Sequence, residues 1–173
     1  DSGLITMTGG KWTTYRKMGE DTIDKVIEVA ALDYRPCATE QLAIHGNAPV
    51  KDRSNPLYVY GSDRQLLEAL IQETPELSEK LHPGYEYVKA QVVLAAREEM
   101  AMTVEDVLAR RMRVLFLDAR AAIDMAPATA SLLAQELGRD EAWEKAQLLS
   151  FVKLANRYLL EAYQPEALEA ILA

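Results

Sequence analysis

TGGKWTTYR occupies residues 8–16, between a short apolar run and a long amphipathic one. The preceding run, Gly3–Thr8, holds β-branched and apolar residues bounded by glycines, which predicts a short strand. Gly9–Gly10 breaks that strand, and apolar residues then recur near helical spacing over Trp12–Ala31, which predicts a helix. We therefore expect a strand, a glycine turn and a helix at the start of the chain.

The glycine turn has a chemistry of its own. Glycine lets the backbone come close to a ligand, and the unpaired N–H groups of a first helical turn carry a partial positive charge. Lys11 adds a full positive charge, and Thr13 and Thr14 can cap the helix or donate hydrogen bonds. Such a turn suits an anion, or a carbonyl that gains negative charge during a reaction.

The residues alone also allow a plainer interpretation of the turn. Its spacing differs from that of the GxxxxGK[ST] phosphate loop. A glycine pair after a strand is common, so without further information the residues favour a tight strand-to-helix turn over a ligand site.

The rest of the chain divides into an irregular part and a helical part. Prolines at 36, 49 and 56, with Gly46–Asn47 between them, indicate a linker or irregular crossover over residues 35–61. Residues 62–173 carry apolar side chains at helical spacing, which predicts a helical bundle. Because a lone strand is not a stable element, we expect the partners of the first strand to lie upstream of Asp1.

Capping residues and helix breakers predict where the helices of the bundle begin and end. We expect helices to begin at Ser62 or Asp63, at Thr74–Pro75, at Thr103 with Asp106 three residues on, and at Asp140, and one helix to cover Tyr85–Met100. We expect helix ends at Pro83–Gly84 and Gly138 and an interruption at Pro127. The last helix should carry Leu159 and Leu160 and stop at a break at Gln164–Pro165.

Composition excludes several classes of protein. A formal net charge of -8 argues against a nucleic-acid-binding surface. Cys37 is the one cysteine, so an internal disulfide cannot form and a reducing compartment is expected. With only His45 and His82 beside it, a zinc site has too few ligands, and we predict no metal site. No apolar run reaches the roughly 18–20 residues that span a bilayer.

Two stretches resemble a known family. Residues 3–22, GLITMTGGKWTTYRKMGEDT, are similar to the end of the FAD-binding domain in FAD-dependent glycerol-3-phosphate dehydrogenases of the respiratory type, within the D-amino-acid-oxidase-like flavoproteins. Residues 97–119, REEMAMTVEDVLARRMRVLFLDA, resemble the signature of that family's helical C-terminal domain. The pattern departs at Met112, where the family often has threonine, and at Gln91, where an acid is expected. The resemblance is weakest over Pro36–Tyr60.

The resemblance implies a mainly α fold of three parts. Residues 1–34 would be a strand-turn-helix remnant of an FAD-binding α/β domain, residues 35–61 a crossover, and residues 62–173 a helical bundle C-terminal domain. We expect the upstream FAD-binding domain of the same chain to be the partner of this remnant.

The resemblance also implies a reaction, the oxidation of sn-glycerol 3-phosphate to dihydroxyacetone phosphate with electrons passed through FAD to quinone. It identifies Gly9, Gly10, Lys11, Trp12, Thr13 and Thr14 as cofactor-binding residues and Lys11 as a catalytic residue near flavin and substrate. The dinucleotide fingerprint, the base and the phosphate-binding arginines are expected upstream, so we predict that this part alone binds no FAD and is inactive. The parent enzyme is expected to be cytoplasmic and peripherally membrane-associated, with a homodimer as a further expectation.

Two other hypotheses remain open. The helical part holds no catalytic constellation, so it can be a non-catalytic module for interaction, dimerisation, membrane docking or shaping the substrate entrance. A free-standing helical adaptor without a flavoprotein parent is a third hypothesis, which the GGKWTTYR run argues against. Within the helical part, Arg111 shares a face with apolar residues, so we predict a structural ion pair with Glu98 or Glu99 rather than a ligand contact.

Overall fold

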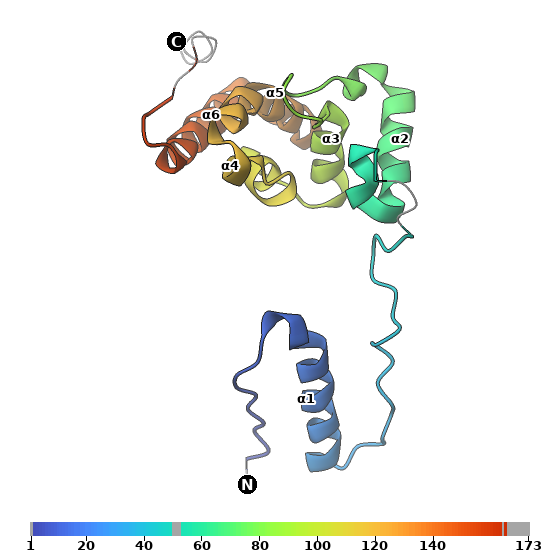
Figure 1. Cartoon of the computed structure of the whole chain (residues 1–173). Helices are drawn as coiled ribbons and strands as arrows, with labels where there is room; N and C mark the ends of the chain where they lie inside the picture. Colours follow the sequence, from blue (N-terminus) through green and yellow to red (C-terminus); the bar gives the residue numbers. More distant parts are fainter. Residues whose placement is uncertain (1, 50–52, 164, 166–173) are drawn as a thin grey trace. The chain divides into compact units, whose positions relative to one another are not determined.

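The computed structural model describes residues 2–49, 53–163 and 165, and the chain forms two compact units, Asp1–Asn47 and Ala48–Ala173. Helices are the main regular structure of both units, and no strand forms among the described residues (Figure 1). The prediction of a mainly α chain is therefore confirmed. We refer to the two parts below as unit 1 and unit 2.

Unit 1 consists of one helix between two irregular segments. A 3-10 turn, η1 (Trp12–Thr14), leads directly into α1 (Tyr15–Val29). This helix was predicted from the spacing of its apolar residues, and its end differs from the expectation by two residues. The strand predicted at Gly3–Thr8 is absent. A strand is stabilised by a hydrogen-bonded neighbour, and residues 2–49 provide none.

Unit 2 is a helical bundle. Its α-helices are α2 (Arg64–Glu73), α3 (Lys89–Glu98), α4 (Val114–Leu117), α5 (Ala119–Leu137) and α6 (Glu141–Ala155). Short elements connect them: the 3-10 segments η2 (Pro56–Asp63), η3 (Pro75–Ser78) and η5 (Asn156–Tyr158), and a π-helix, η4 (Asp106–Arg111). α3 packs against α2 on one side and α5 on the other, and α5 packs against α6 (Figure 1).

The core of unit 2 has a large and a small part. The large part joins α3, η4, α4, α5 and α6 and includes the fully buried Leu108, Ile123, Leu133 and Leu148. The small part is formed where Leu67 of α2 meets Ala90 and Leu94 of α3. Burial of apolar surface on this scale is what stabilises a domain of this size.

Three of the predicted caps are confirmed. Thr103 Oγ1 accepts from the Asp106 N–H at 3.1 Å while the Asp106 carboxylate accepts from the Thr103 N–H at 3.0 Å, a reciprocal capping box. Asp140 Oδ1 accepts from the N–H of Trp143 at 2.9 Å. Gly138 ends α5 in the left-handed conformation with φ 61°.

Pro127 does not interrupt the bundle as predicted. α5 runs from Ala119 through Pro127 to Leu137. A proline in a helix interior removes one backbone hydrogen bond and costs about 3 kcal/mol. The helix continues because its buried face, rich in alanine, packs closely against α3 on one side and α6 on the other.

The helices predicted around Pro83–Gly84 are also shorter than expected. Residues 79–89 form a hairpin-like loop, in which the Leu81 N–H donates to the Tyr87 C=O at 2.9 Å and the Lys89 N–H donates to the Glu79 C=O at 3.0 Å. These cross-loop bonds end the earlier helix at Ser78 and delay the next one to Lys89.

Smaller differences remain at other helix ends. The Asp63 side chain, which precedes α2, accepts no capping hydrogen bond from the helix backbone. The last helix ends at Ala155, so Leu159 and Leu160 lie beyond it. The break predicted at Gln164–Pro165 falls largely outside the described residues.

The two positions that depart from the family pattern are both buried in unit 2. Gln91 Oε1 accepts from the Val88 N–H at 2.9 Å, and its amide nitrogen donates to the Tyr60 hydroxyl at 2.9 Å. The Met112 C=O accepts from the Tyr87 hydroxyl at 3.0 Å. Both residues therefore have structural roles at the start of α3 and the end of η4.

Candidate functional site

The glycine turn in unit 1 has a backbone conformation that favours glycine. Gly9 has φ 82° and Gly10 has φ 100°, both in the region that side chains rarely adopt. A Cβ added to Gly10 would lie 2.1 Å from Met18 Sδ, whereas one added to Gly9 would meet nothing within 4 Å. Gly10 thus allows the turn to pack against α1, and Gly9 leaves open space beside the backbone.

The helix that follows begins with a closed hydrogen-bond arrangement. Thr14 Oγ1 accepts from the Lys11 N–H at 3.2 Å and donates to the Lys11 C=O at 2.9 Å. The first hydrogen bond of the helix runs from the Thr14 N–H to the same Lys11 C=O at 2.8 Å. The N–H groups of Trp12 and Thr13 precede this bond, so they have no intrahelical acceptor and can donate to an external one.

All six predicted site residues, from Gly9 to Thr14, are exposed and lie in this single turn. The Trp12 side chain is 87% exposed, and its ring lies 6.1 Å from that of Tyr15 at an interplanar angle of 38°. The turn therefore presents two N–H groups, the Lys11 charge and two aromatic rings to its surroundings. Thr14 has the clearest local role, because its hydroxyl caps the turn.

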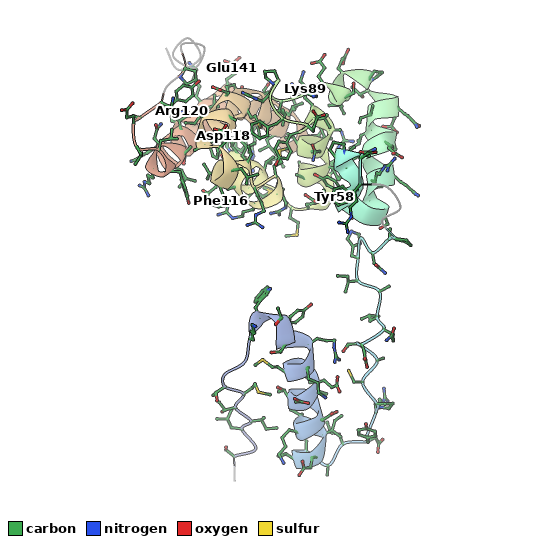
Figure 2. The ribbon with its side chains drawn as sticks, in the orientation of Figure 1. Tyr58, Lys89, Phe116, Asp118, Arg120 and Glu141 are labelled. Carbon is green, nitrogen blue, oxygen red and sulfur yellow. The ribbon has the colours of Figure 1, made fainter. Side chains whose placement is uncertain are left out.

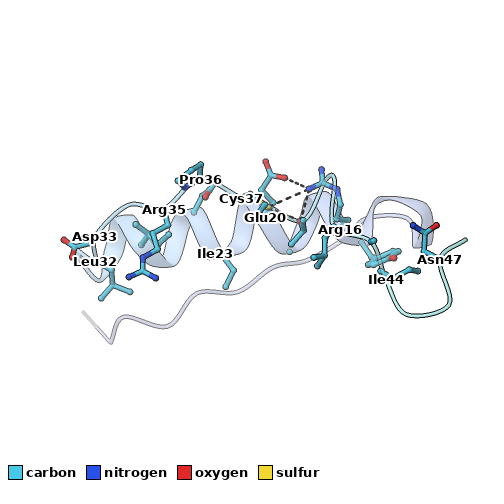
Figure 3. Close-up of a pocket in the computed structure, with 18 residues that line it drawn as sticks. Arg16, Glu20, Ile23, Leu32, Asp33, Arg35, Pro36, Cys37, Ile44 and Asn47 are labelled. Carbon is cyan, nitrogen blue, oxygen red and sulfur yellow. Dashed lines mark hydrogen bonds and ion pairs between the residues drawn. The ribbon is translucent and has the colours of Figure 1, made fainter. Parts of the chain in front are cut away.

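A groove of about 1040 Å³ lies beside α1 in the same unit. Apolar side chains of the helix, such as Ile23 and Ile27, form one wall, and the returning segment 32–47 forms the other. Arg16, on α1, donates to Glu20 of the same helix at 2.6 Å (Figure 3). It also donates to Thr39 Oγ1 at 3.2 Å, and this second bond joins the two walls. None of the residues 2–47 is buried, so the apolar side chains that line the groove remain at least partly exposed.

Electrostatics fix the ionisation of the groove's acid. Hydrogen bonds from Lys17 and Arg16 lower the pKa of Glu20 to about 2. Glu20 in turn raises the pKa of Lys17. Glu20 is therefore a charged structural partner at neutral pH, not a proton donor or acceptor.

No sequence pattern indicated the contribution of Met18 and Thr39. Met18 packs against Gly10, and Thr39 holds the returning segment to α1. The Arg16–Glu20 pair has the i, i+4 spacing that a helix brings together, so it was recoverable from the sequence. The Thr39 and Met18 contacts depend on how the chain folds back, which no local pattern signals.

Arg111, for which the sequence predicts an ion pair rather than a ligand contact, has a structural partner. Its Nε lies 3.6 Å from Glu99 Oε2, and its Nη2 donates to the Glu99 C=O. The pair joins the end of α3 to η4, so the predicted ion pair is confirmed with Glu99 as the partner. Burial raises the pKa of Glu99, and the charge of Arg111 opposes that shift. Arg110 lies at the surface with Glu105 and Asp106.

Neither a metal site nor a membrane span is found in the described part of the chain. Its histidine, cysteine and acidic residues form no cluster that could hold a metal ion. None of its helices combines the length and apolarity needed to cross a membrane.

Comparison with known proteins places the chain in a family. Residues 8–144 match the family described as the C-terminal domain of alpha-glycerophosphate oxidase. The chain is 37% identical over 171 residues to the probable mitochondrial glycerol-3-phosphate dehydrogenase of Caenorhabditis elegans, covering 85% of this chain and 23% of that protein. It is 31% identical over 182 residues to the mitochondrial glycerol-3-phosphate dehydrogenase of Rattus norvegicus, covering 92% and 24%.

The human protein of the same name is 32% identical over 171 residues, which cover 86% of this chain and 23% of that protein. No solved structure matches the chain. The chain thus spans about a quarter of the length of the curated relatives it matches. The match over residues 8–144 includes both the glycine turn and most of the helical bundle, and the chain belongs to the family of the C-terminal domain of alpha-glycerophosphate oxidase, whose relatives here are glycerol-3-phosphate dehydrogenases.

Proposed function

We propose that the chain is the C-terminal portion of an FAD-dependent glycerol-3-phosphate dehydrogenase. The parent would oxidise sn-glycerol 3-phosphate to dihydroxyacetone phosphate and pass the electrons to quinone. The observation that carries this proposal is the exposed Gly9–Gly10–Lys11 turn, which is followed by two N–H groups without an intrahelical acceptor. The family match and the names of the relatives support the same reaction class.

The residues of the turn fit a flavin ring. When bound, FAD supplies the acceptor for the hydride that leaves the substrate's alcohol carbon. The open space beside Gly9 allows a planar ring to approach the backbone. The N–H groups of Trp12 and Thr13 would donate to a ring oxygen, and the helix N-terminus would stabilise negative charge there.

Lys11 would act through its charge. As an exposed ammonium beside the turn, it would lie close to both the flavin and the anionic substrate. Its attraction strengthens as negative charge develops, so it lowers the barrier more than it strengthens binding of the ground state. Lys11 is therefore the residue of this chain that we propose as catalytic.

The isolated chain should be inactive. The turn offers FAD one wall of a site, while pyrophosphate, ribose and adenine require a dinucleotide-binding domain. The exposed apolar groove of unit 1 supports this expectation, because such a surface usually marks a contact with another part of a protein. We propose that the FAD-binding domain of the same polypeptide is that contact.

Location and assembly are further parts of the proposal. The relatives are named as mitochondrial enzymes, whereas the sequence led us to expect a cytoplasmic enzyme. Peripheral attachment to a membrane would bring the parent to its quinone acceptor in either case. A homodimer remains part of the proposal.

Lys11→Ala in the full-length parent tests the function. We expect turnover to fall by about 10²–10³-fold, as for loss of one preorganised electrostatic contact, with flavin still bound. The matched control is Lys17→Ala, which removes the same charge from the same helix start but only breaks the surface pairs with Glu20 and Asp21. Normal turnover in Lys11→Ala, or yellow flavin-loaded protein from the isolated 173 residues, would overturn the proposal.

For unit 2 we keep the second function, a non-catalytic interaction module. The observation that favours this function is the ion pair of Arg111 with Glu99, which occupies an arginine that could otherwise contact a ligand. Arg111→Ala in the parent should leave the Michaelis constant for glycerol 3-phosphate unchanged. A large rise in that constant would instead assign unit 2 to substrate binding.

A further inference from the structure

Both polar groups of the Lys11 backbone are bonded to a single residue, Thr14. The Lys11 N–H donates to Thr14 Oγ1 at 3.2 Å, and the Lys11 C=O accepts from Thr14 Oγ1 at 2.9 Å and from the Thr14 N–H at 2.8 Å. The planar peptide groups on either side of a residue determine the direction in which its side chain leaves the backbone. The ammonium at the end of the Lys11 side chain forms no ion pair within the described part of the chain. Lys11 is therefore held through its backbone, by Thr14.

The residue before Lys11 contacts the same face of the helix. Thr14 and Met18 have the i, i+4 spacing that places two side chains on one helix face. Met18 packs against Gly10, where an added Cβ would lie 2.1 Å from Met18 Sδ. The segment before the glycine turn runs back along α1 (Figure 2). Gly10 and Lys11 thus contact Met18 and Thr14 in turn, so this face of the helix fixes where the turn lies.

The Thr14 hydroxyl has little hydrogen-bonding capacity left for a ligand. A hydroxyl has one proton to donate and two lone pairs that accept. The Thr14 hydroxyl donates its proton to the Lys11 C=O, and one lone pair accepts from the Lys11 N–H. A flavin carbonyl and a phosphate oxygen are acceptors, which require a donor that Thr14 no longer supplies. The Thr13 hydroxyl differs, because it has no hydrogen-bond partner among the described residues and can donate to such an oxygen.

We propose that Thr14 is a positioning residue, which acts on the reaction through Lys11 rather than by touching the flavin. This inference rests on the proposed function, in which the Lys11 charge stabilises negative charge that develops on flavin and substrate. Such stabilisation depends on a charge that is in place before the reaction begins. A lysine side chain has many rotamers, and a backbone that could also turn would spread the ammonium over a larger volume. Thr14 limits that spread by holding the Lys11 backbone.

Thr14→Val in the full-length parent tests the inference, because valine has the shape of threonine without the hydroxyl. We expect turnover to fall about 10-fold, within the loss of up to about 10²-fold that misplacing a catalytic group by about 1 Å can cause. The Michaelis constant for glycerol 3-phosphate should change little, since Lys11 acts mainly in the transition state. Flavin should stay bound. Thr14→Ser, which keeps the hydroxyl, should restore turnover.

Thr22→Val is the matched control. Thr22 lies further along α1, and its hydroxyl donates to the Met18 C=O at 2.7 Å. The same substitution there removes a hydroxyl hydrogen bond from the same helix but leaves both Lys11 bonds in place. Turnover of Thr22→Val should equal that of the wild type. A loss as large as that of Thr14→Val would mean that any loosening of α1 slows the enzyme, and it would overturn the inference.

The double variant Lys11→Ala/Thr14→Val separates positioning from other roles. If Thr14 acts through Lys11, removal of its hydroxyl should not slow the Lys11→Ala enzyme further. The inference alone would be overturned by a further loss in the double variant, by normal turnover or loss of flavin in Thr14→Val, or by failure of Thr14→Ser to restore turnover. Normal turnover of Lys11→Ala would instead refute the proposed function, and the inference with it.

Discussion

The two units of this molecule are stabilised in different ways. Every buried side chain among the described residues belongs to unit 2, and residues 2–47 have none. Unit 1 is held by a turn that packs Gly10 on Met18 and by Arg16 contacts at the surface. Unit 2 is held by interlocking apolar residues from five elements.

The residues that stabilise the fold and the residues that we propose for the chemistry therefore belong to different units. The proposed flavin turn is in the unit without a core, and the helical unit with the core has no residue that we propose as catalytic. We therefore expect unit 1 to be less stable than unit 2, because an isolated helix of this length is only marginally stable in water.

Phe151→Ala should destabilise the isolated chain strongly. Phe151, on α6, is buried in the large part of the core, and removing such a ring typically costs about 3–5 kcal/mol. Urea denaturation followed by circular dichroism measures the change. Ile23→Ala, on the exposed face of α1, is the control and should shift the free energy of unfolding by less than about 0.5 kcal/mol. If Phe151→Ala and Ile23→Ala lowered the free energy of unfolding equally, the two units would not differ in how they are stabilised.

Asp106→Ala should have the next largest effect. Its carboxylate accepts from the N–H groups of Met102 and Thr103 and from the Thr103 hydroxyl. Losing such a cap costs about 1–2 kcal/mol in the free energy of unfolding. Glu105→Ala changes the adjacent acid, which makes only a surface pair with Arg110, and should cost well under 1 kcal/mol. If Asp106→Ala left the free energy of unfolding unchanged, packing alone would stabilise η4.

Arg111→Ala should cost less than the cap. Breaking a fully buried ion pair costs about 3–5 kcal/mol, but Arg111 and Glu99 remain 29% and 32% exposed, so we expect about 1 kcal/mol. Thermal unfolding of the isolated chain measures it. Arg110→Ala, its neighbour at the surface, should be close to neutral. A larger loss of stability for Arg110→Ala than for Arg111→Ala would show that partial burial is not the reason why the Arg111–Glu99 pair stabilises the fold.

Acidification should act on unit 1 with the smallest effect. The folded pKa of Glu20 is about 2, below its ordinary value of 4.5, so its pairing stabilises the fold above pH 4.5. That stabilisation is lost as the pH falls from 4.5 towards 2. Amide chemical shifts of α1 and Thr39, followed by nuclear magnetic resonance, should change together over this range. Glu20→Gln should abolish the change; its persistence would assign the titration to another acid.

Local signals were readable from the sequence, and tertiary ones were not. Thr103, Gly138 and Asp140 were predicted because a cap depends on three or four consecutive residues. The glycine turn was placed for the same reason. The flavin role of its residues came from the resemblance and stays a proposal.

The errors arose where distant parts of the chain decide the structure. Pro127 was predicted to break a helix, but contacts with α3 and α6 hold α5 together on both sides. The strand at Gly3–Thr8 had the right composition and no neighbour. At residues 79–89, backbone bonds across the loop replaced the helical ones that the pattern favoured. Each outcome depended on a partner segment that periodicity does not identify.

The boundary between Asn47 and Ala48 has a consequence for how this protein would be degraded during storage. A protease meets unit 1 first, because exposed segments with few contacts open readily. Cleavage near the boundary would remove the glycine turn and leave the whole apolar core behind. The thermal unfolding curve of such a sample would be unchanged, although every molecule in it had lost Lys11. Intact mass, rather than thermal stability, is therefore the measure of quality for preparations of this protein.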